Sequence, residues 1–509
     1  MGESVAVGRR GFLALAAVAG AAACAPQFVR QTSAVAAGAP QSERPASAVA
    51  AVSGLDLAAL KKALTGPLLR SGDAGYAVAA QPFNAALGVR KPLAVAKVAK
   101  VADVTTCVRR VAGHGVPLAA RSGGHSYAGF STPNNGVVVD LGTLRGITVK
   151  SDGTAVVGAG ARLIDVYAAL AAHGRALPAG SCPTVGIAGS TLGGGIGVVA
   201  RAYGLTCDHL KSATVVGADG NVYTASANVN SDLYWALRGG GGGNGGIVTD
   251  FTFTTVPAPT VTIFSLHFPA ARTAQVLRAW STWMDAAPDR LSALCAVTAA
   301  ATPTNRVTGT WTGSTAGLAT QLAALIGAIG AAPTSRTQHT YNYLDAMKYF
   351  AGCLNETIDA CHPASTPGGT QGRESFRAAS RMLDRTITAS TADRVVDLIR
   401  RQNGMVLLFD SLRGQVAKPQ VADTAFAHRA AHGSVQVYSG NAANGPAVIA
   451  VQKALAPLVG SGAYVNYLNP GQTDWATAYY GANLPRLRQV VKHWDPSGVF
   501  TFAQSVLKA

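Results

Sequence analysis

The 509-residue chain contains 48% hydrophobic and only 13% charged residues, a composition that excludes a disordered or fibrous protein. Its formal net charge is +17, but the basic residues are scattered without runs or interleaved aromatic stripes, so no nucleic-acid partner is expected. No apolar stretch long enough to span a membrane follows the N-terminal segment. The length itself predicts two domains.

The N-terminal segment has the form of a twin-arginine export signal. Arg9-Arg10-Gly11-Phe12-Leu13 leads into a short apolar stretch that ends near Ala23, and a Ser/Ala-rich spacer continues to Ala50. This export route carries proteins that fold, often around a cofactor, before they cross the membrane. We therefore interpret residues 1–50 as a signal and spacer and expect a periplasmic, cell-surface or extracellular protein. Attachment of a lipid at Cys24 is an alternative that the sequence leaves open.

Short Val/Ile/Ala-rich strands alternate with helical stretches between residues 75 and 258. Apolar residues recur at helical spacing over 95–113, where Gly113 provides a stop signal. Two further stretches, 136–140 and 155–158, have the character of buried strands, and 163–173 predicts a helix closed by a glycine. These elements predict one mixed α and β domain.

The composition changes after Pro259, where glycine clusters become rarer. A predicted strand over 261–267 and an Ala/Leu-rich helix over 316–329 are typical of the region 259–456, which we interpret as a second domain covering the first. Residues 457–509 return to aromatic and basic composition and are expected to dock onto the fold.

The cysteines and histidines predict no metal site. There is no Cys-x-x-Cys pair, and His428 and His432, four residues apart, have no third ligand nearby. Cys353 and Cys361 lie eight residues apart in a loop-like stretch and are expected to form a disulfide in an oxidising compartment. Three cysteines in apolar contexts are expected to be buried thiols: Cys107, Cys207 and Cys295.

Three glycine-rich stretches carry the functional signal. Arg121 to Tyr127 contains consecutive glycines whose backbone N–H groups can form an anion-binding nest for a pyrophosphate. The stretches 180–197 and 239–246 are dense enough in glycine to predict backbone packed directly against a flat ligand. His125 and Cys182 place a nucleophilic imidazole and a thiol within these stretches. Together they favour an organic redox cofactor tethered at two points, which we interpret as a flavin.

An ordered set of motifs resembles the berberine-bridge-enzyme-like flavoproteins of the vanillyl-alcohol-oxidase superfamily. The set comprises Arg121–Tyr127, Gly180–Gly197, Tyr203–Asp208, Asp232–Gly239, Tyr464–Tyr467 and the closing run from Trp475 to Ser505. The resemblance implies an α+β fold: a two-subdomain FAD-binding domain of the PCMH type over 75–258, an α+β substrate domain with an antiparallel sheet over 259–456, and a C-terminal segment, 457–509, that completes the FAD domain.

The resemblance also implies FAD attached by two covalent bonds, from His125 to the 8α methyl group and from Cys182 to C6 of the isoalloxazine. Imidazole and thiolate are nucleophiles suited to these electron-poor positions. The remaining residues expected to bind the cofactor are Arg121, Ser122, Gly123, Gly124, Ser126, Gly180, Val185, Gly186, Gly189, Gly194, Gly195, Gly197, Gly246, Ile247, Val248 and Asn466.

For catalysis, the resemblance places the base at Tyr467, with Tyr464 as the alternative and Asn466 as a residue that orients the phenol or contacts the flavin. Because a phenol titrates near pH 10, a neighbouring cation or hydrogen bonds would have to stabilise its phenolate. Position 469 carries Asn where many relatives carry Asp, so the acidic partner of the tyrosine is unassigned.

Val185 matches the position where the family tunes oxygen access, and a valine there is similar to the oxygen-reactive members. The expected reaction is therefore hydride transfer from an alcohol or sugar hydroxyl carbon to FAD, with O2 as acceptor and H2O2 as product. Two alternatives remain open: a dehydrogenase with another acceptor, and a non-catalytic flavoprotein that binds a ligand.

Overall fold

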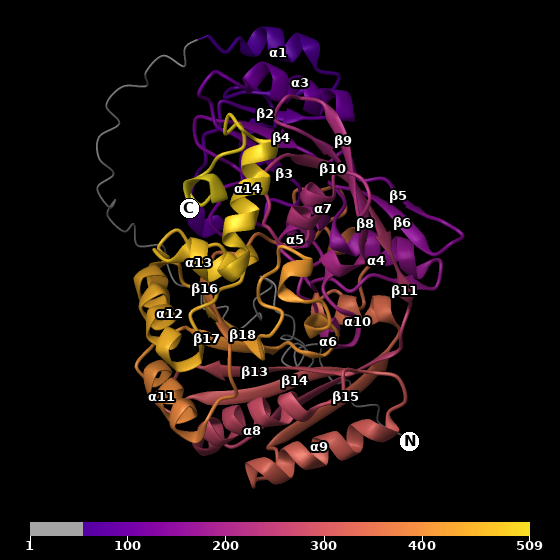
Figure 1. The fold of residues 1–509 in the computed structure, drawn as a ribbon. Helices are drawn as coiled ribbons and strands as arrows, with labels where there is room; N and C mark the ends of the chain where they lie inside the picture. Colours follow the sequence, from indigo (N-terminus) through magenta and orange to yellow (C-terminus); the bar gives the residue numbers. More distant parts are fainter. Residues whose placement is uncertain (1–53) are drawn as a thin grey trace, which may run out of the picture.

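Residues 54–509 are described in the computed structural model, which is mixed α and β (Figure 1), so the interpreted export signal over 1–50 and Cys24 lie outside the described residues. The described chain forms three large sheets of four, five and seven strands. Among residues 54–509, no helix has the length and apolar character needed to cross a membrane.

The first sheet is built around three parallel strands of Val and Ala. Its order is β1 (Leu68–Leu69), β2 (Ala94–Lys97), β4 (Val137–Asp140) and β3 (Leu118–Arg121), with β1 antiparallel to β2. Helix α3 (Val101–Val111) connects β2 to β3 and buries its valines. The helix predicted over 95–113 is therefore wrong at its start, because pairing with β4 draws 94–97 into the sheet.

This part of the fold begins earlier in the chain than residue 75. Helix α1 (Leu57–Ala63) packs on α3, and β1 pairs with β2. Asp103 joins the segments, since its buried carboxylate accepts hydrogen bonds from the backbone N–H groups of Thr65, Gly66 and Ala99. A short helix, α2 (Tyr76–Ala79), follows.

The second sheet is antiparallel, in the order β5–β6–β10–β8–β9. Its strands are β5 (Ile147–Val149), β6 (Thr154–Gly158), β10 (Ile247–Thr254), β8 (Leu210–Val216) and β9 (Val222–Ser226). The helices inserted between them are α4 (Leu163–Ala171), α5 (Ile187–Leu192), α6 (Ala200–Tyr203) and α7 (Ser231–Leu237). The strand and helix predicted over 155–158 and 163–173 are confirmed by β6 and α4.

A small ribbon of β7 (Arg175–Ala176) and β11 (Val256–Pro257) closes this half and leads into the seven-stranded antiparallel sheet. The sheet order is β15 (Ser335–Tyr341), β12 (Val261–His267), β14 (Thr304–Thr312), β13 (Leu291–Thr298), β17 (Val406–Ser411), β18 (Gly433–Ser439) and β16 (Arg377–Leu383). The antiparallel sheet predicted for the second domain is thus confirmed.

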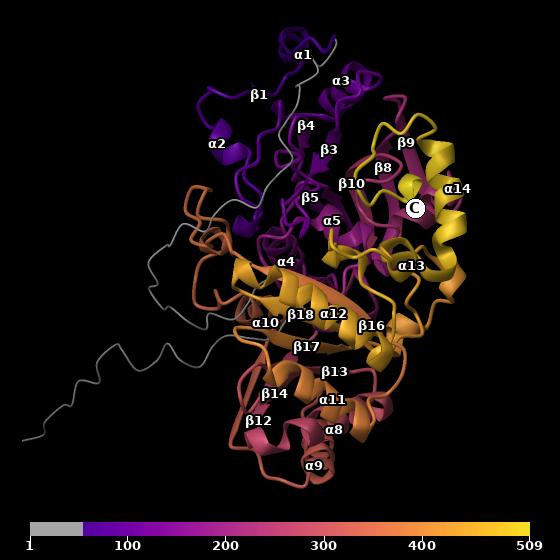
Figure 2. The ribbon, with the colours of Figure 1, turned by 90° about the vertical axis from the view of Figure 1, so that its left-hand side faces the viewer.

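The two faces of the seven-stranded sheet have different partners. Its outer face packs on the helices α8 (Thr273–Ala286), α9 (Ala316–Ile329), α11 (Ala389–Arg400) and α12 (Gly445–Val459), as Figure 2 shows. Its inner face packs on aromatic residues of the half that holds the four- and five-stranded sheets, including Tyr127, and on Tyr467 of the C-terminal segment. Helix α10 (Tyr343–Phe350) lies on the inner side, against α4.

The C-terminal segment returns to the first half of the molecule. Helix α14 (Leu484–Trp494), yellow in Figure 1, lies beside α7, and α13 (Trp475–Tyr480) contacts α14. The Trp494 indole donates to Asp232 at 3.1 Å, and the buried Asp495 carboxylate accepts from the backbone N–H of Phe500 at 2.8 Å. This segment therefore packs against the half that holds the four- and five-stranded sheets.

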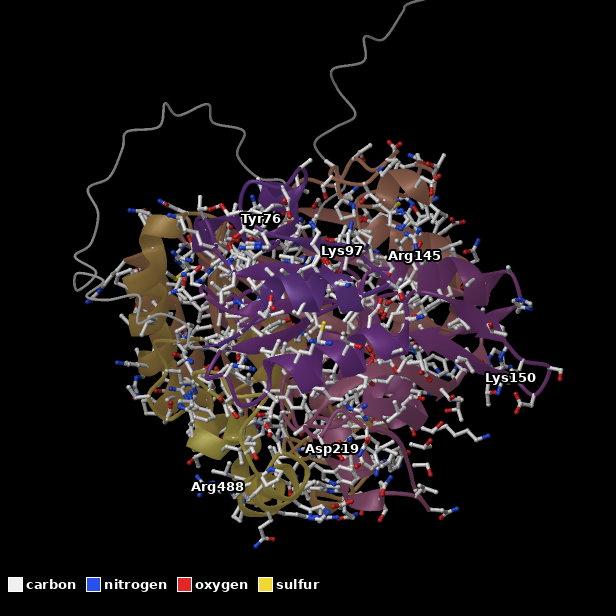
Figure 3. The ribbon with its side chains drawn as sticks, turned by 90° about the horizontal axis from the view of Figure 1, so that it is seen from above. Tyr76, Lys97, Arg145, Lys150, Asp219 and Arg488 are labelled. Atoms are coloured by element: carbon white, nitrogen blue, oxygen red, sulfur yellow. A yellow bond between two sulfur atoms is a disulfide. The ribbon has the colours of Figure 1, made fainter. Side chains whose placement is uncertain are left out.

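The cysteines follow the expectation from their spacing. Cys353 and Cys361 form a disulfide in the loop after α10, and His362 beside it pairs with Asp165 of α4 at 2.8 Å. Cys107, Cys207 and Cys295 are buried free thiols. On the face seen in Figure 3, the labelled basic side chains Lys97, Arg145, Lys150 and Arg488 lie at separate places.

Candidate active site

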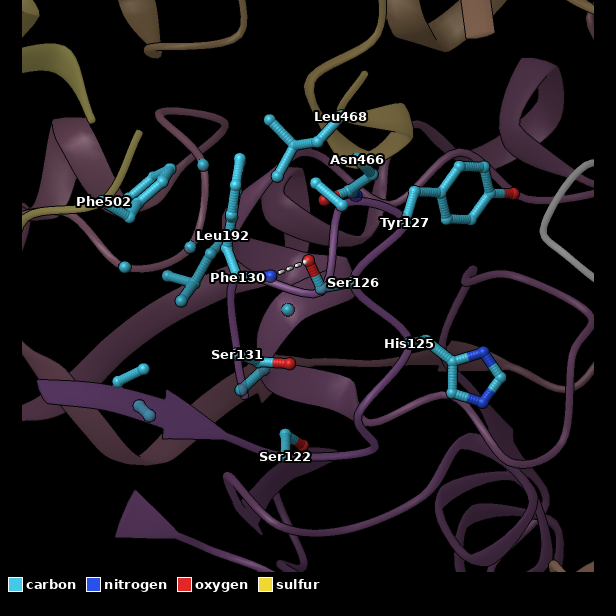
Figure 4. Close-up of a pocket in the computed structure, with 18 of the residues that line it drawn as sticks. Ser122, His125, Ser126, Tyr127, Phe130, Ser131, Leu192, Asn466, Leu468 and Phe502 are labelled. Carbon is cyan, nitrogen blue, oxygen red and sulfur yellow. Dashed lines mark hydrogen bonds between the residues drawn. The ribbon is translucent and has the colours of Figure 1, made fainter. Parts of the chain in front are cut away.

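A cavity of about 560 Å³ lies where the four-stranded sheet, the five-stranded sheet and the C-terminal segment meet. Fourteen of the residues assigned to the site from the sequence line it: Ser122, Gly123, Gly124, His125, Ser126, Val185, Gly186, Gly189, Gly246, Ile247, Val248, Tyr464, Asn466 and Tyr467. Figure 4 shows His125 and Tyr127 at one end and Phe502 at the other. The structure thus brings together motifs from opposite ends of the chain.

Close contact between two backbone segments explains the glycines in the wall of this cavity. A Cβ on Gly123 would lie 2.2 Å from the backbone nitrogen of Gly186, and one on Gly186 would lie 2.0 Å from the Ser122 hydroxyl oxygen. At Gly189 no atom lies within 4 Å of the same position. Backbone therefore forms the wall, and it leaves room for a flat ligand.

Six of the residues assigned to the cofactor do not line the cavity: Arg121, Gly180, Cys182, Gly194, Gly195 and Gly197. Arg121 is buried in an ion pair with Asp140 at 2.7 Å. The Gly180 carbonyl accepts a hydrogen bond from the Tyr167 hydroxyl. The three later glycines sit where a Cβ would strike Phe426, Thr206 and the Ala179 carbonyl, so close packing explains them.

His125 is held firmly at one end of the cavity. Its ring stacks on Phe83 with centroids 3.7 Å apart, and Nε2 lies 2.9 Å from the Thr184 hydroxyl oxygen. Nδ1 is buried and has no hydrogen-bond partner. Burial, together with the charge of Arg162, lowers the pKa of His125 to about 3, so the imidazole is neutral.

Cys182 lies behind the cavity wall and is fully buried. Its Sγ is 3.7 Å from the same Thr184 hydroxyl that contacts His125. Thr184, 1% exposed, therefore links the two residues expected to attach the cofactor. Sequence reasoning missed this role, although Thr184 stands within the Cys-Pro-Thr stretch that singled out Cys182.

The two tyrosines of the C-terminal motif have different surroundings. The Tyr464 hydroxyl accepts from the backbone N–H groups of Gly195 and Ile196 at 3.0 and 3.1 Å and from the Asn466 amide at 2.8 Å. Burial raises the pKa of Tyr464 to about 12. Tyr464 and Asn466 thus brace the backbone after α5, and the Tyr464 hydroxyl already has three donors.

Tyr467 is packed between aromatic rings at the edge of the cavity. Its ring stacks on Tyr127 at 5.0 Å and meets Tyr464 edge-on at 5.0 Å. The Tyr127 hydroxyl in turn accepts from the Gln436 amide of β18 at 2.8 Å. Burial, with smaller contributions from Tyr127 and Asp410, raises the pKa of Tyr467 well above its usual value.

The ionisable neighbours that act on the pKa of Tyr467 are two tyrosines and an acid, with no cation among them. Asp410 of β17 is close enough to act on its pKa, and Asp410 Oδ2 is buried without a hydrogen-bond partner. Burial raises the pKa of Asp410 to about 8. The expected stabilisation of a phenolate by a cation or by hydrogen bonds stays a prediction, and in the structure burial is the main cause that keeps the proton on the Tyr467 phenol, as the raised pKa shows.

Other lining residues were not assigned from the sequence. Phe130 and Phe502 pack 5.2 Å apart, and the Phe130 N–H donates to the Ser126 hydroxyl at 3.1 Å (Figure 4). Residues 241–243 also line the cavity. The glycine run over 239–246 pointed to them, whereas Phe130 had no sequence signal.

The residues present fit an extended flavin cofactor. The cavity has the volume of a ligand site, backbone lines much of it, and a neutral imidazole at one end carries a free nitrogen. Within residues 54–509, no group of three or more His, Cys, Asp and Glu side chains is arranged to hold a metal. His428 contacts the Tyr479 carbonyl at 3.1 Å, and His432 pairs with Asp285 at 2.9 Å.

Comparisons with known proteins agree with this geometry. The profile of a family described as "FAD binding domain" matches residues 92–226, and that of "Berberine and berberine like" matches 463–507. Among solved structures, a chitooligosaccharide oxidase superimposes with a TM-score of 0.79 at 29% identity, covering 88% of this chain and 98% of that one. A xylooligosaccharide oxidase from Myceliophthora thermophila, solved with xylobiose, gives 0.79 at 28% identity with the same coverage.

Relatives by sequence cover most of the chain. An uncharacterized FAD-linked oxidoreductase of Bacillus subtilis, YgaK, is 32% identical over 462 residues, which span 88% of this chain and 98% of the relative. A chitooligosaccharide oxidase of Gibberella zeae is 30% identical over 442 residues, or 82% and 87% of the two chains. Matching motifs, fold and full-length relatives lead to one conclusion: the chain belongs to the berberine-bridge-enzyme-like family of FAD-linked oxidoreductases.

Proposed function

We propose that this protein is an exported oxidase that removes a hydride from a sugar or alcohol hydroxyl carbon and passes the electrons to O2, giving H2O2. Its FAD is held by two covalent bonds, from His125 to the 8α methyl group and from Cys182 to C6. One observation carries the proposal: Tyr467, backed by the buried acid Asp410, borders the same cavity as a neutral His125 with a free Nδ1.

The residues divide the proton chemistry between them. The Tyr467 hydroxyl contacts the substrate hydroxyl, and its rigid packing on Tyr127 fixes the direction of the phenol. Because the raised pKa keeps Tyr467 protonated, the phenol must transfer its own proton to another group when it accepts the proton of the substrate hydroxyl. Asp410, with a pKa of about 8, is the acceptor when ionised. Bound FAD supplies the hydride acceptor.

The substrate class rests on the relatives. Structural relatives include a chitooligosaccharide oxidase and a xylooligosaccharide oxidase, which places sugar hydroxyls first among the candidates. Ser434 and Gln436 on the inner face of the seven-stranded sheet are buried and do not line the cavity, so they are not counted as contacts to the substrate.

A reductive screen tests the catalytic proposal. Anaerobic protein is mixed with a panel of mono- and oligosaccharides and simple alcohols, and bleaching of the flavin absorbance is followed. We expect at least one sugar to bleach the flavin, and air to restore the colour within seconds with formation of H2O2. Restoration over minutes would favour a dehydrogenase with another acceptor, and no bleaching would favour a ligand-binding flavoprotein.

Denaturation tests the covalent bonds. Flavin colour and mass are expected to stay with the acid-precipitated chain in His125→Ala and in Cys182→Ala, and to be lost when both are replaced. Release of all the flavin from the unaltered chain contradicts covalent attachment.

Cell fractionation tests export. Replacing Arg9 and Arg10 by Lys is expected to retain the protein inside the cell, because the twin-arginine pair is the feature that defines this route. Equal amounts outside the cell for both forms contradict this route.

A further inference from the structure

The Thr184 hydroxyl lies between the two side chains that attach the cofactor. Its Oγ1 is 2.9 Å from Nε2 of His125 and 3.7 Å from Sγ of Cys182, and both Thr184 and Cys182 are shielded from solvent. The Thr184 carbonyl is fixed as well, since it accepts from the Arg162 guanidinium at 2.8 Å. One hydroxyl therefore contacts both attachment residues from a rigid position.

A hydroxyl carries one hydrogen, so its two contacts are not independent. His125 Nδ1 is buried without a partner, and the ring is neutral, so one of its nitrogens bears the proton. Either tautomer hydrogen-bonds to Thr184 through Nε2 and leaves Nδ1 without a partner, but only a proton on Nε2 leaves Nδ1 with the lone pair that the attachment needs. In that tautomer Nε2–H donates to Oγ1, which leaves the Thr184 hydrogen available to Sγ, a contact in which either atom can be the donor.

We propose that Thr184 is the positioning residue for both covalent bonds, because one orientation of its hydroxyl leaves Nδ1 of His125 free to attack and supplies a hydrogen bond to Sγ of Cys182. This inference rests on the covalent attachment in the proposed function. Phe83 contributes by stacking on the imidazole face, so the free nitrogen keeps one direction. Thr184 itself forms no bond to the cofactor.

Each attachment reaction balances with dioxygen as the oxidant. At His125, a bond forms from Nδ1 to the 8-methyl carbon; one proton leaves that carbon, one leaves Nε2, and two electrons enter the flavin ring. At Cys182, a bond forms from Sγ to C6, and the thiol proton and the hydrogen on C6 are lost with two electrons to the ring. Dioxygen then removes the two electrons and two protons as H2O2 in each case.

The test separates the two bonds. Cys182→Ala leaves only the His125 bond and His125→Ala only the Cys182 bond, and each is combined with Thr184→Val or Thr184→Ser. Flavin-poor protein is mixed with FAD, and the covalent fraction is measured at intervals after acid denaturation, with peptide mass locating the bond. Thr184→Val, which keeps the side-chain shape, is expected to slow both attachments about tenfold, the effect of one lost hydrogen bond.

Two controls distinguish positioning from packing. Thr184→Ser, which restores the hydroxyl, is expected to return both rates to within about twofold of the parent. Thr191→Val alters another fully buried threonine, whose hydroxyl has no partner, and is expected to leave both rates unchanged. Total flavin bound per chain, measured before denaturation, is expected to be equal in all forms.

The outcomes that overturn the inference are distinct from failure of the proposed function. Three results overturn the inference that one hydroxyl serves both attachments. The first is that Thr184→Val leaves both attachment rates unchanged, and the second is that it slows the formation of only one of the two bonds. The third is that Thr184→Ser fails to restore the rates. Absence of covalent flavin from both single-bond parents that retain Thr184 overturns covalent attachment itself, and the inference with it.

Discussion

The FAD-binding half and the seven-stranded sheet contribute to one site in opposite ways. In the FAD-binding half, glycines bring backbone segments together, as where Gly123 meets Gly186, and backbone forms much of the cavity wall. In the sheet, by contrast, β17 and β18 place polar side chains on the inner face at alternating positions, among them Asp410 and Gln436. The proposed cofactor side is thus specified by local motifs, and the proposed substrate side by which strands pair.

Tyr467 belongs to the C-terminal segment and Asp410 to the sheet, so the two halves are expected to depend on each other for catalysis. Removing the Tyr467 hydroxyl gives the largest effect. In Tyr467→Phe, the rate of flavin reduction by substrate is expected to fall about 10³-fold, because proton transfer loses its contact with the substrate. Anaerobic stopped-flow absorbance measures this rate, and flavin content is expected to be unchanged.

Tyr464→Phe is the matched control. Tyr464 is the alternative base named from the sequence, but its hydroxyl accepts hydrogen bonds from backbone N–H groups, and the proposed reaction uses Tyr467. Its loss is expected to lower the melting temperature more than the reduction rate. An equal loss of rate in both variants would contradict the assignment of catalysis to Tyr467.

The backbone packing of the FAD-binding half is tested next, at Gly195. This residue has φ +83°, and a Cβ would lie 2.2 Å from the Thr206 hydroxyl oxygen. Gly195→Ala is expected to lower the free energy of unfolding by about 2–4 kcal/mol through backbone strain and this clash. Denaturant unfolding followed by fluorescence measures the change. Unaltered stability would show that the loop relaxes, and that close packing does not explain this glycine.

Sequence reasoning succeeded where a signal is local to one segment, and it failed where the pairing of distant strands decides the structure. Helix α9 and strand β12 have the bounds expected from their patterns, and the cavity-lining glycines stand in recognisable runs. Residues 95–97 were misassigned because helical apolar spacing continues into a strand that only pairing with β4 reveals. Asp410 had no signal, since its meeting with Tyr467 depends on β17 pairing with β13 and β18, far apart in the chain.

The sheet's acid is expected to give the reaction its pH dependence. Burial raises the pKa of Asp410 to about 8, so the carboxyl is protonated below that pH and accepts a proton only above it. The flavin-reduction rate is therefore expected to rise with pH through about 8 and then level off. Asp410→Asn is expected to abolish this rise and to lower the rate about tenfold at high pH.

Asp397→Asn is the control for that profile. Asp397 is an exposed residue of α11 that pairs with Arg400 at 3.4 Å on the surface, and its replacement is expected to keep the rise with pH. A rise near pH 8 that persists in Asp410→Asn would assign the titration to another group and would remove the sheet from the proton pathway.

The smallest expected effect comes from repeating the glycine-to-alanine change in the other half of the molecule. Gly327 lies inside α9, without positive φ and with no atom within 4 Å of the position that a Cβ would take. Because alanine loses less backbone freedom than glycine on entering a helix, Gly327→Ala is expected to raise the free energy of unfolding by about 0.5–1 kcal/mol. The same unfolding measurement checks it. If the free energy of unfolding falls in Gly195→Ala and rises in Gly327→Ala, close backbone approach requires glycine at the first site, and glycine is only tolerated at the second. A loss of stability at both sites would remove that distinction.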